Sequence, residues 1–560
     1  MSRNIVLIGM PGCGKSTLCR IVSEKLSRCA IDLDDYIEAN EKKSIKEMFA
    51  VSERLFRDAE TKYSILAGEL NSYIIATGGG IVKREENINN LKKNSVIIFI
   101  NRPIEDIIKD IDVKTRPLLS DGTADIYKLY NDRIHLYKKS CDIEIINVGK
   151  IEEVADLIIK SVNIWKGRII MEEKNRALKK HMEWKGKLEV VTKAKIDSME
   201  DLAIAYTPGV AEPCLEIARD ESLAYEYTGK GNLVAVITDG TAVLGLGDIG
   251  PSAGMPVMEG KCALFKRFAG IDAIPICVDS KDPEVIINTV RNISKSFGGI
   301  NLEDISAPRC FEIERALAEQ CDIPVFHDDQ HGTAIVTTAA IINSLKVTGR
   351  KPGNLKIVIS GAGAAGISIA RLLVQMDMGD IILCGSKGTI YEGAPGNNSE
   401  KEQMAKITNK GCVKGSLSDA MKGADIFIGV SKPGIVTKEM IKSMAENPIV
   451  FAMANPVPEI MPNEATEAGA AVAGTGRSDF PNQVNNVLVF PGFFKGLLRV
   501  RAVKVVDSMK IQAAMAIAGI IDEKELKSTY VLPEVFDERV ADAVANAVAE
   551  EAVRLGINRK

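Results

Sequence analysis

The sequence predicts an α/β protein with parallel sheets, and two observations lead to this class. An apolar run from Asn4 to Ile8 is followed at once by a glycine-rich loop, "GMPGCGKST", and then by a helical pattern. A second apolar run, Leu355 to Ser360, enters "GAGAAG" and then a helix, and another strand pattern follows. Strands that alternate with helices through glycine turns are typical of parallel sheets covered by helices. At 560 residues the chain is too long for one core, so we expect several domains.

Composition and charge exclude several classes of function. The formal net charge is −4, and Lys and Arg are dispersed along the chain, so a nucleic acid is not expected as a partner. No apolar stretch reaches the roughly 18 residues that would cross a bilayer, and the start of the chain does not resemble a signal peptide. The eleven cysteines include no CxxC pair, which favours a reducing compartment. We therefore expect a cytoplasmic protein without membrane partners.

The first glycine-rich loop matches the phosphate-binding pattern G-x-x-x-x-G-K-[ST] in its required setting, between a strand and a helix. Backbone N–H groups of such a loop, together with the helix N-terminus, cradle the phosphates of a nucleotide. Lys15 would reach the β and γ phosphates, and Ser16 would contact Mg²⁺. The ATP-binding set predicted in this way is Gly9, Gly12, Gly14, Lys15, Ser16 and Thr17.

An ordered series of motifs then extends over about the first 160 residues: "IDLDDYIE", "SERLFRDAE", "TGGGIV", "TRPLL" and "DRIHLY". In this series the chain resembles shikimate kinase. The resemblance implies that Asp32 lies on the metal side, that Asp34 is the base for the shikimate hydroxyl, and that Arg116 belongs to a lid. It also implies a shikimate-binding set of Asp34, Arg57, Gly78, Gly79, Gly80 and Arg133.

The chemistry of these residue types agrees with the resemblance. Two arginines can clamp a carboxylate, an aspartate can take a hydroxyl proton, and a lid arginine can neutralise charge on the transferred phosphoryl group. His135 and Ser52 stand where the family usually has proline and glycine. Two alternatives stay open: the domain is a non-catalytic nucleotide-binding or oligomerising module, or it phosphorylates another small hydroxylated acceptor.

Two acidic clusters lie between residues 301 and 333. Glu303 and Asp304 precede an amphipathic helical pattern, and Asp328 and Asp329 end a short apolar strand. Carboxylates at such ends offer hard oxygen ligands to Mg²⁺ or Mn²⁺, although solvated turns are the more common reason for an acidic pair. The neighbouring His327 and His331 have no cysteine partner, which disfavours zinc, so we interpret both histidines as structural or supporting residues.

From about residue 171 to the C-terminus the motifs "AYTPGV", "MPVMEGK", "LEDI" and "HDDQHGTA" occur in an order that resembles the malic enzymes, in their shorter prokaryotic form. The resemblance implies a metal site, a catalytic lysine with a neighbouring aspartate, and a catalytic tyrosine. The metal ligands would be Glu303, Asp304 and Asp329. The lysine would be Lys261, its neighbour Asp328, and the tyrosine Tyr206. Ala242 stands where the larger eukaryotic enzymes have a substrate-binding arginine, so another group must make that contact.

The second glycine motif is a dinucleotide fingerprint formed by Gly361, Gly363 and Gly366. The next strand ends in "CGSKG", without the acidic residue that binds the ribose of NAD. Ser386 and Lys387 stand there instead and favour the 2′-phosphate of NADP, with NAD as the alternative. The malic enzyme resemblance further nominates three substrate-facing asparagines, Asn455, Asn485 and Asn486, for which turn capping is the ordinary role.

The predicted organisation has five parts: a shikimate kinase-like P-loop domain at 1–163, a linker at 164–187, a substrate and metal domain at 188–350, a Rossmann-type NAD(P)-binding domain at 351–503, and C-terminal helices at 504–560. The predicted function is bifunctional: ATP-dependent phosphorylation of shikimate, and oxidative decarboxylation of L-malate to pyruvate and CO₂ with NAD(P) and a divalent metal. For the malic enzyme-like part, a different 2-hydroxy acid in place of malate stays open as an alternative. A homodimer is the expected assembly.

Overall fold

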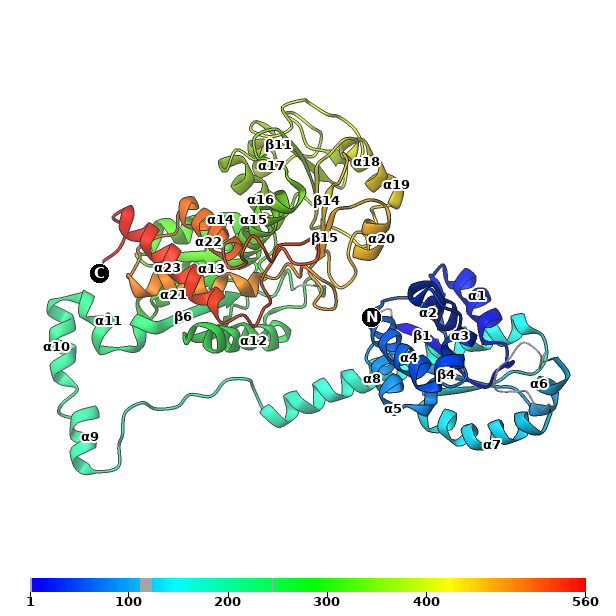
Figure 1. The fold of residues 1–560 in the computed structure, drawn as a ribbon. Coiled ribbons are helices and arrows are strands. Elements are labelled where there is room, and N and C mark those ends of the chain that lie inside the picture. Colours follow the sequence, from blue (N-terminus) through cyan, green and yellow to red (C-terminus); the bar gives the residue numbers. More distant parts are fainter. Residues whose placement is uncertain (1–2, 111–122, 244, 560) are drawn as a thin grey trace. The chain divides into compact units, whose positions relative to one another are not determined.

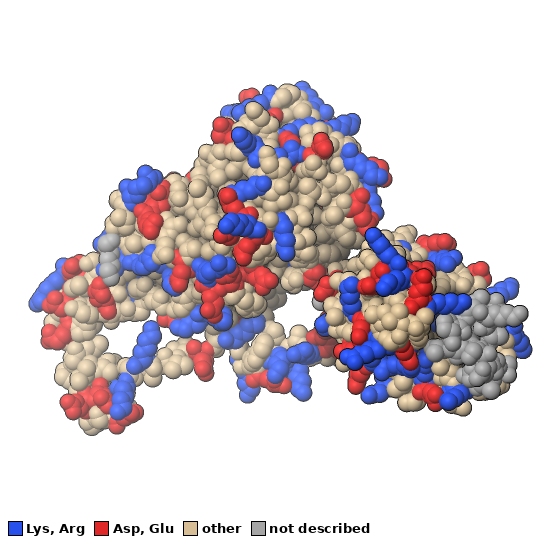
Figure 2. Space-filling model, viewed as in Figure 1, with Lys and Arg blue, Asp and Glu red and all other residues tan. Residues whose placement is uncertain are grey.

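The computed structural model describes residues 3–110, 123–243 and 245–559, and the chain divides into two compact units, Met1–Glu183 and Trp184–Lys560 (Figure 1). Each unit is built around parallel sheets, which confirms the predicted α/β class. Basic and acidic side chains are interspersed over the face shown in Figure 2. Among the described residues, no helix is both long and apolar enough to cross a lipid bilayer.

Unit 1 contains a five-stranded parallel sheet in the order β2-β3-β1-β4-β5. The central strand β1 is buried along its whole length, because every residue of "NIVLI" lies inside the domain. The carboxyl ends of β1, β2 and β3 therefore open at one edge, where the predicted phosphate loop and acceptor residues follow. The strands are β1 (Asn4–Ile8), β2 (Ala30–Asp32), β3 (Ile74–Ala76), β4 (Ser95–Asn101) and β5 (Ile143–Ile146).

Helices cover this sheet, and their ends follow local capping chemistry. Ser44 and Glu47 form a capping box at the start of α3, in which each side chain bonds the backbone of the other residue. The last helix, α8, packs through Val154 and Ile158 on the unit 1 core but is exposed from Met171 onwards. The helices of the unit are α1 (Lys15–Leu26), α2 (Leu33–Glu41), α3 (Ile45–Val51), α4 (Glu53–Glu69), η1 (Ile81–Lys83), α5 (Glu85–Lys92), α6 (Ile104–Asp110), α7 (Thr123–Ser140) and α8 (Ile151–Trp184).

The first part of unit 2 has a four-stranded parallel sheet in the order β7-β6-β8-β9. Because β8 and β9 are neighbours, the residues that follow Leu302 and His327 meet at the same edge. The strands are β6 (Leu233–Thr238), β7 (Asp272–Cys277), β8 (Gly299–Leu302) and β9 (Val325–His327). The helices are α9 (Met199–Ala205), α10 (Ala211–Arg219), η3 (Glu221–Leu223), α11 (Ala224–Tyr227), η4 (Gly229–Asn232), α12 (Pro251–Ala269), α13 (Pro283–Ile293), η5 (Ser294–Ser296), α14 (Arg309–Gln320) and α15 (Asp328–Thr348).

The second sheet of unit 2 has six strands in the order β12-β11-β10-β13-β14-β15, and all but the short β12 are parallel. The strand order reverses at β10, which has β11 on one side and β13 on the other, and ligands of open α/β sheets bind at such a point. The strands are β10 (Leu355–Ser360), β11 (Gly379–Gly385), β12 (Gly388–Thr389), β13 (Ile426–Gly429), β14 (Ile449–Ala452) and β15 (Val472–Thr475). The helices are α16 (Ala364–Gln375), α17 (Ser399–Ala405), α18 (Leu417–Met421), α19 (Lys438–Lys442) and α20 (Pro462–Glu467).

The C-terminal helices return to the first sheet of unit 2. Phe490 and Phe494 of α21 lie against Phe265 of α12, with ring centroids 4.7 and 5.3 Å away, and Phe493 lies 4.7 Å from Phe326 of β9. This aromatic cluster fixes α12 and β9 relative to each other. The elements are η6 (Asn486–Leu488), α21 (Phe490–Arg499), α22 (Asp507–Ala518) and α23 (Arg539–Arg554).

Candidate active sites

The glycine-rich loop of unit 1 lies between β1 and α1 as a phosphate loop requires. Gly14 has a φ of 92°, and no side chain caps α1, so the N–H groups of its first turn point outward unblocked. The Nζ of Lys15 folds back on the loop and donates to the carbonyl oxygens of Gly9 and Met10, each at 2.9 Å. The loop therefore holds Nζ of Lys15 where a phosphate oxygen could accept its hydrogen bonds in place of these two carbonyl oxygens.

The predicted magnesium side of this site is assembled from two elements. The Oγ of Ser16 donates to Oδ2 of Asp32 at 2.5 Å, and Oδ1 of the same aspartate accepts from the backbone N–H of Asp34 at 3.1 Å. Asp32 therefore has two roles, since one of its oxygens caps α2 and the other contacts the phosphate loop. A hydroxyl beside a carboxylate fits a hydrated Mg²⁺, which takes few protein ligands.

The predicted acceptor residues meet around the three glycines Gly78 to Gly80. A Cβ at Gly78 would lie 2.5 Å from Oδ1 of Asp34, and one at Gly80 would lie 2.2 Å from a guanidinium nitrogen of Arg57. Arg133 donates to the carbonyl oxygen of Gly79 at 2.8 Å. Only glycine leaves room for these side chains, so the structure brings the predicted set together. Arg116 lies outside the described residues.

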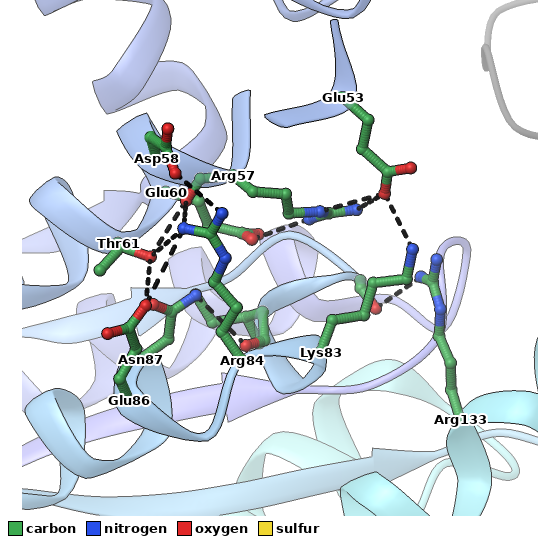
Figure 3. A network of polar contacts seen from close by, with 12 residues as sticks. Glu53, Arg57, Asp58, Glu60, Thr61, Lys83, Arg84, Glu86, Asn87 and Arg133 are labelled. Atoms are coloured by element: carbon green, nitrogen blue, oxygen red, sulfur yellow. Dashed lines mark hydrogen bonds and ion pairs between the residues drawn. The ribbon is translucent and has the colours of Figure 1, made fainter. Parts of the chain in front are cut away.

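The charges around Arg57 form a dense network (Figure 3). Arg57 pairs with Glu60 at 2.7 Å and with Glu53 at 3.3 Å, and Lys83 shares Glu53 at 2.8 Å. Burial raises the pKa of Glu60, although Arg57 opposes this rise. Sequence reasoning missed Glu60, yet its place three residues after Arg57 puts both on one face of α4 and is the signal that could have found it.

Asp34 has an unusual environment for an aspartate. Burial, followed by the charges of Asp32 and Glu60, raises the pKa of Asp34 to about 7. Its Oδ1 has no hydrogen-bond partner among the described residues. A carboxyl group with a pKa near neutrality and a free oxygen is suited to proton transfer. Tyr137, which sequence reasoning did not single out, supports the pocket by donating to the carbonyl oxygen of Gly79 at 2.6 Å.

In unit 2 the acidic clusters meet at the edge where β8 and β9 end. One carboxylate oxygen each from Glu303, Asp304 and Asp329 lie within 4.8 Å of one another. The backbone N–H of Asp304 donates to Oδ2 of Asp329 at 2.7 Å, which joins the loop after β8 to the first turn of α15. Asp304 adopts a positive φ of 54°, in the left-handed region that aspartate tolerates better than most residues.

The three carboxyl groups are in an environment that disfavours bare negative charge. Burial raises the pKa of Asp304 to about 9, with further contributions from Asp329 and Glu303. Burial likewise raises the pKa of Glu303 and of Asp329. Crowded oxygen donors of this kind, of which those of Glu303 and Asp304 are buried, fit a divalent cation such as Mg²⁺ or Mn²⁺, which would supply the missing positive charge.

Lys261 of α12 is buried beside this cluster. Its Nζ is 2.9 Å from Oε1 of Glu303, contacts Oδ2 of Asp328, and lies 4.0 Å from the ring centroid of Phe490. Burial acts to lower the pKa of Lys261, but the charges of Asp328 and Glu303 outweigh it and hold the pKa above its ordinary range. A lysine that acts as a base near neutral pH needs a depressed pKa, and the charges of the protein alone act in the opposite direction.

Of the three predicted asparagines, one reaches this group. The Nδ2 of Asn486 donates to Oδ2 of Asp328, the oxygen that also contacts Lys261. Asn485 accepts from the backbone N–H of Val487 at 3.0 Å and caps η6, which is the ordinary role of asparagine in a turn. Asn455 is exposed in the turn after β14.

Tyr206 is not brought to the lysine. It ends α9, 67% of its surface is exposed, and neither α9 nor α10 contains a buried residue. Figure 1 draws both helices away from α12, which carries Lys261. Sequence reasoning places Tyr206 and Lys261 in one site, and within this chain the structure keeps them apart.

The dinucleotide motif has the expected close approaches. Gly361 has a φ of 115°, and a Cβ there would lie 2.5 Å from the carbonyl oxygen of Val430. A Cβ at Gly366 would lie 1.7 Å from the carbonyl oxygen of Gly361, whereas the space around Gly363 at the N-terminus of α16 is open. A pyrophosphate could therefore approach the backbone at Gly363. Beyond β11 lies a pocket lined in part by Ser386, Lys387, Tyr391, Asn397 and Lys401.

Glu459 is a residue of this domain that sequence reasoning missed. It is fully buried and accepts from the backbone N–H groups of Ser431 at 2.7 Å and of Ala454 at 3.0 Å. The hydroxyl of Ser431 lies 3.0 Å from that of Ser360. This chain of contacts ties together the ends of β10, β13 and β14. No local pattern in "PVPE" distinguishes such a buried glutamate from an exposed one.

Comparison with known proteins assigns successive parts of the chain to two enzyme families. The family model "Shikimate kinase" matches residues 11–163, "Malic enzyme, N-terminal domain" matches 185–318, and "Malic enzyme, NAD binding domain" matches 330–553. The bifunctional malic/malolactic enzyme of Bacillus subtilis is 56% identical over 390 residues, which cover 70% of this chain and 95% of that protein. The NADP-dependent malic enzyme of Halomonas elongata is 50% identical and is covered to 92%, with 67% of this chain matched.

Solved structures give the same result. The NAD-dependent malic enzyme of Thermotoga maritima is 46% identical, with a TM-score of 0.65, and the match covers 67% of this chain and 98% of that one. The malic enzyme of Pyrococcus horikoshii is 45% identical, with a TM-score of 0.66, and the match covers 69% of this chain and 92% of that one. The chain therefore belongs to the malic enzymes and carries a shikimate kinase domain in front of the malic enzyme part.

Proposed function

We propose that the chain is a bifunctional enzyme. Unit 2 converts L-malate to pyruvate and CO₂ with a divalent metal and NADP, and unit 1 transfers the terminal phosphoryl group of ATP to shikimate. The observation that carries the first activity is the buried contact of Lys261 with Asp328 and Glu303, next to the carboxylate cluster, in a chain of the malic enzyme family. The domain bounds given from the sequence belong to this proposal. So does a reducing cytoplasm as the compartment, with which the eleven free cysteine thiols agree.

In the malate reaction Glu303, Asp304 and Asp329 would hold the metal. When bound, the cation would polarise the 2-oxo oxygen formed during the reaction, and NADP would accept the hydride from C2. Lys261 would accept the proton of the 2-hydroxyl group, oriented by Asp328. After C4 leaves as CO₂, Tyr206 would protonate C3 to give pyruvate.

The electrostatics of Lys261 bear on this role. A lysine whose pKa is held high by two carboxylates is charged in the free protein and is a poor base. A divalent cation bound by Glu303 would place positive charge beside Nζ and neutralise one of the two carboxylates. Both effects lower the lysine pKa, so Lys261 would become a base only in the loaded site.

We expect Mn²⁺ to stabilise the full-length protein, and to do so more strongly at higher pH. Asp304 has a folded-state pKa of about 9, far above its unfolded value of 3.8, and the pKa values of Glu303 and Asp329 are also raised. The folded state thus binds protons more tightly, and without metal the free energy of unfolding falls as pH rises through this window. Mn²⁺ replaces those protons.

Differential scanning calorimetry after EDTA treatment, with and without Mn²⁺ at pH 6 and pH 8, measures this effect. The Tm increase should be larger at pH 8, and Asp329→Asn should remove it. Glu319→Gln, at an exposed position of α14, is the matched control and should keep the full increase. A Tm increase that is the same in Asp329→Asn would contradict the assignment of the ligands.

The preference for NADP rests on the pocket beyond β11. Lys387 and Lys401 line it, and Ser386 stands where an NAD enzyme would carry a carboxylate. Lys387→Ala should raise the KM for NADP by about tenfold, the effect of losing one charged contact of about 1.4 kcal/mol. The KM for NAD should change little. Steady-state kinetics with both cofactors measure the split, and Lys410→Ala, an exposed lysine of the same domain, is the control. An equal loss with both cofactors would exclude a 2′-phosphate contact.

The exposure of Tyr206 leads us to propose a homodimer in which the tyrosine serves the partner's site. The segment around it exposes large apolar side chains: Val190 is 95% exposed, Met199 80% and Ile204 69%. Apolar surface of this extent marks an interface in a folded protein. In a two-fold dimer the same segment of each copy would cover the other copy, and each site would receive its tyrosine from outside.

Co-expression of two inactive variants tests this arrangement. Lys261→Ala and Tyr206→Phe should each lower malate oxidation at least about 100-fold. If the tyrosine acts across the dimer, a mixed dimer contains one site with both native residues, and a random mixture regains about a quarter of the native activity. If both residues act within one chain, the mixed dimer has no complete site. A mixture that stays inactive while mixed dimers form would exclude the shared site.

The kinase proposal rests on the assembly of Lys15, Asp34, Arg57 and Arg133 around one edge of the sheet. Lys15→Ala should abolish ATP-dependent phosphorylation of shikimate and leave the oxidation of malate intact, and Lys261→Ala should do the reverse. A coupled assay for ADP measures the kinase activity. The absorbance of NADPH and the amount of pyruvate formed measure the oxidation of malate. Native protein that binds ATP without any turnover of shikimate would favour the non-catalytic module.

A further inference from the structure

Glu314 lies behind the turn that carries two of the acidic residues. It belongs to α14, which contributes none of the candidate metal ligands. Its Oε1 accepts from the backbone N–H of His327 at 3.2 Å and from Nε2 of His331 at 2.7 Å. His327 immediately precedes α15, and His331 follows one turn later. One carboxylate oxygen therefore holds both ends of the turn that contains Asp328 and Asp329.

This glutamate is largely enclosed. The side chains of Glu314 and His331 are only 16% and 15% exposed. Burial acts to raise the pKa of Glu314, and His331 and then Lys510 act to lower it, while burial lowers the pKa of His331 itself. Lys510 is in turn paired with Asp507 at 2.8 Å. The hold on α15 therefore comes from two hydrogen bonds to one enclosed carboxylate oxygen.

The ring of His327 does not provide a second anchor for this turn. The side chain of His327 does not cap α15, and neither of its ring nitrogens has a hydrogen-bond partner among the described residues. In front of the turn, Asp329 accepts from the N–H of Asp304, and Asp328 contacts Lys261. A small rotation of the turn would move both aspartates at once, because they are adjacent in the chain.

We propose that Glu314 is a positioning residue that holds the first turn of α15, so that Asp329 meets Glu303 and Asp304 while Asp328 meets Lys261. The inference rests on the proposed role of Glu303, Asp304 and Asp329 as metal ligands. Glu314 itself touches neither metal nor substrate. It acts through the backbone at His327 and through the ring of His331.

The geometry allows a sharp test, because both hydrogen bonds end on the same oxygen. Glu314→Gln keeps one carbonyl oxygen that can accept both bonds, and it removes only the charge. Glu314→Ala removes both bonds. The Kd for Mn²⁺, measured from the electron paramagnetic resonance signal of free Mn²⁺ with full-length protein, should rise about 10- to 100-fold in Glu314→Ala, as for other residues that orient metal ligands. In Glu314→Gln it should stay within about threefold of the native value, since the acceptor remains.

Controls separate positioning from general damage. Glu319→Ala, on the exposed face of the same helix, should bind Mn²⁺ like the native protein. If Glu314→Ala does not fold, His331→Ala keeps the bond from Glu314 to His327 and should show an intermediate loss of affinity. Glutamine and alanine variants with the same weak affinity would show that charge matters and position does not, and native affinity in both would also overturn the proposal.

A further variant distinguishes this inference from the proposed function beneath it. Glu303→Gln removes a proposed ligand and should abolish tight Mn²⁺ binding. If Glu303→Gln binds Mn²⁺ like the native protein, the metal site itself is misassigned. If Glu303→Gln loses the metal but Glu314→Ala does not, the site stands and only the positioning role of Glu314 fails.

Discussion

The contact of Lys261 with Glu303 and Asp328 is the interaction on which unit 2 depends. Four carboxyl groups converge where β8 and β9 end, and among the residues described there Lys261 is the positive group in direct contact with two of them. A buried charge that lost its partner would be strongly destabilising. The elements around this group, α12, α15 and the aromatic cluster of α21, therefore have to keep one ammonium group among several carboxylates. Lys261 offsets part of the negative charge of these carboxylates, and a bound divalent cation would offset more of it.

The two units use the same principle in different chemistry. In unit 1, burial, together with the nearby charges of Asp32 and Glu60, raises the pKa of Asp34 to about 7. In unit 2, burial, together with the charges of Asp329 and Glu303, raises the pKa of Asp304 to about 9. Each site concentrates like charge at the carboxyl edge of a parallel sheet, where backbone geometry brings strand ends together. In the proposed reactions, metal ions bound at these edges would supply the opposite charge.

Glycine motifs made most of the fold predictable. Gly361 and Gly366 approach backbone oxygens so closely that no other residue fits, and Gly78 and Gly80 make room for Asp34 and Arg57 in the same way. These constraints act within a few residues or through a single crossing, so they leave a readable pattern in the sequence. The α/β class, the parallel sheets and both nucleotide loops followed from that pattern.

The contacts of several site residues, including some that the sequence nominates, could not be predicted because they depend on distant parts of the chain. Asn486 reaches Asp328 across 158 positions of the chain, and Glu314 reaches His331 between separate helices. Glu459 acquires its role only when three strand ends meet. Tyr206 is a further case, because 67% of its surface is exposed within one chain and no local pattern in the sequence indicates this.

The two units belong to one polypeptide chain and are connected through α8. Translation of one message delivers a kinase domain and a malic enzyme part in a fixed stoichiometry of one to one, whatever the demand for either product. Among the described residues of the connection, the second half of α8 and the irregular stretch that follows it to residue 198 are mostly exposed. Proteolysis there would allow the two units to acquire separate lifetimes.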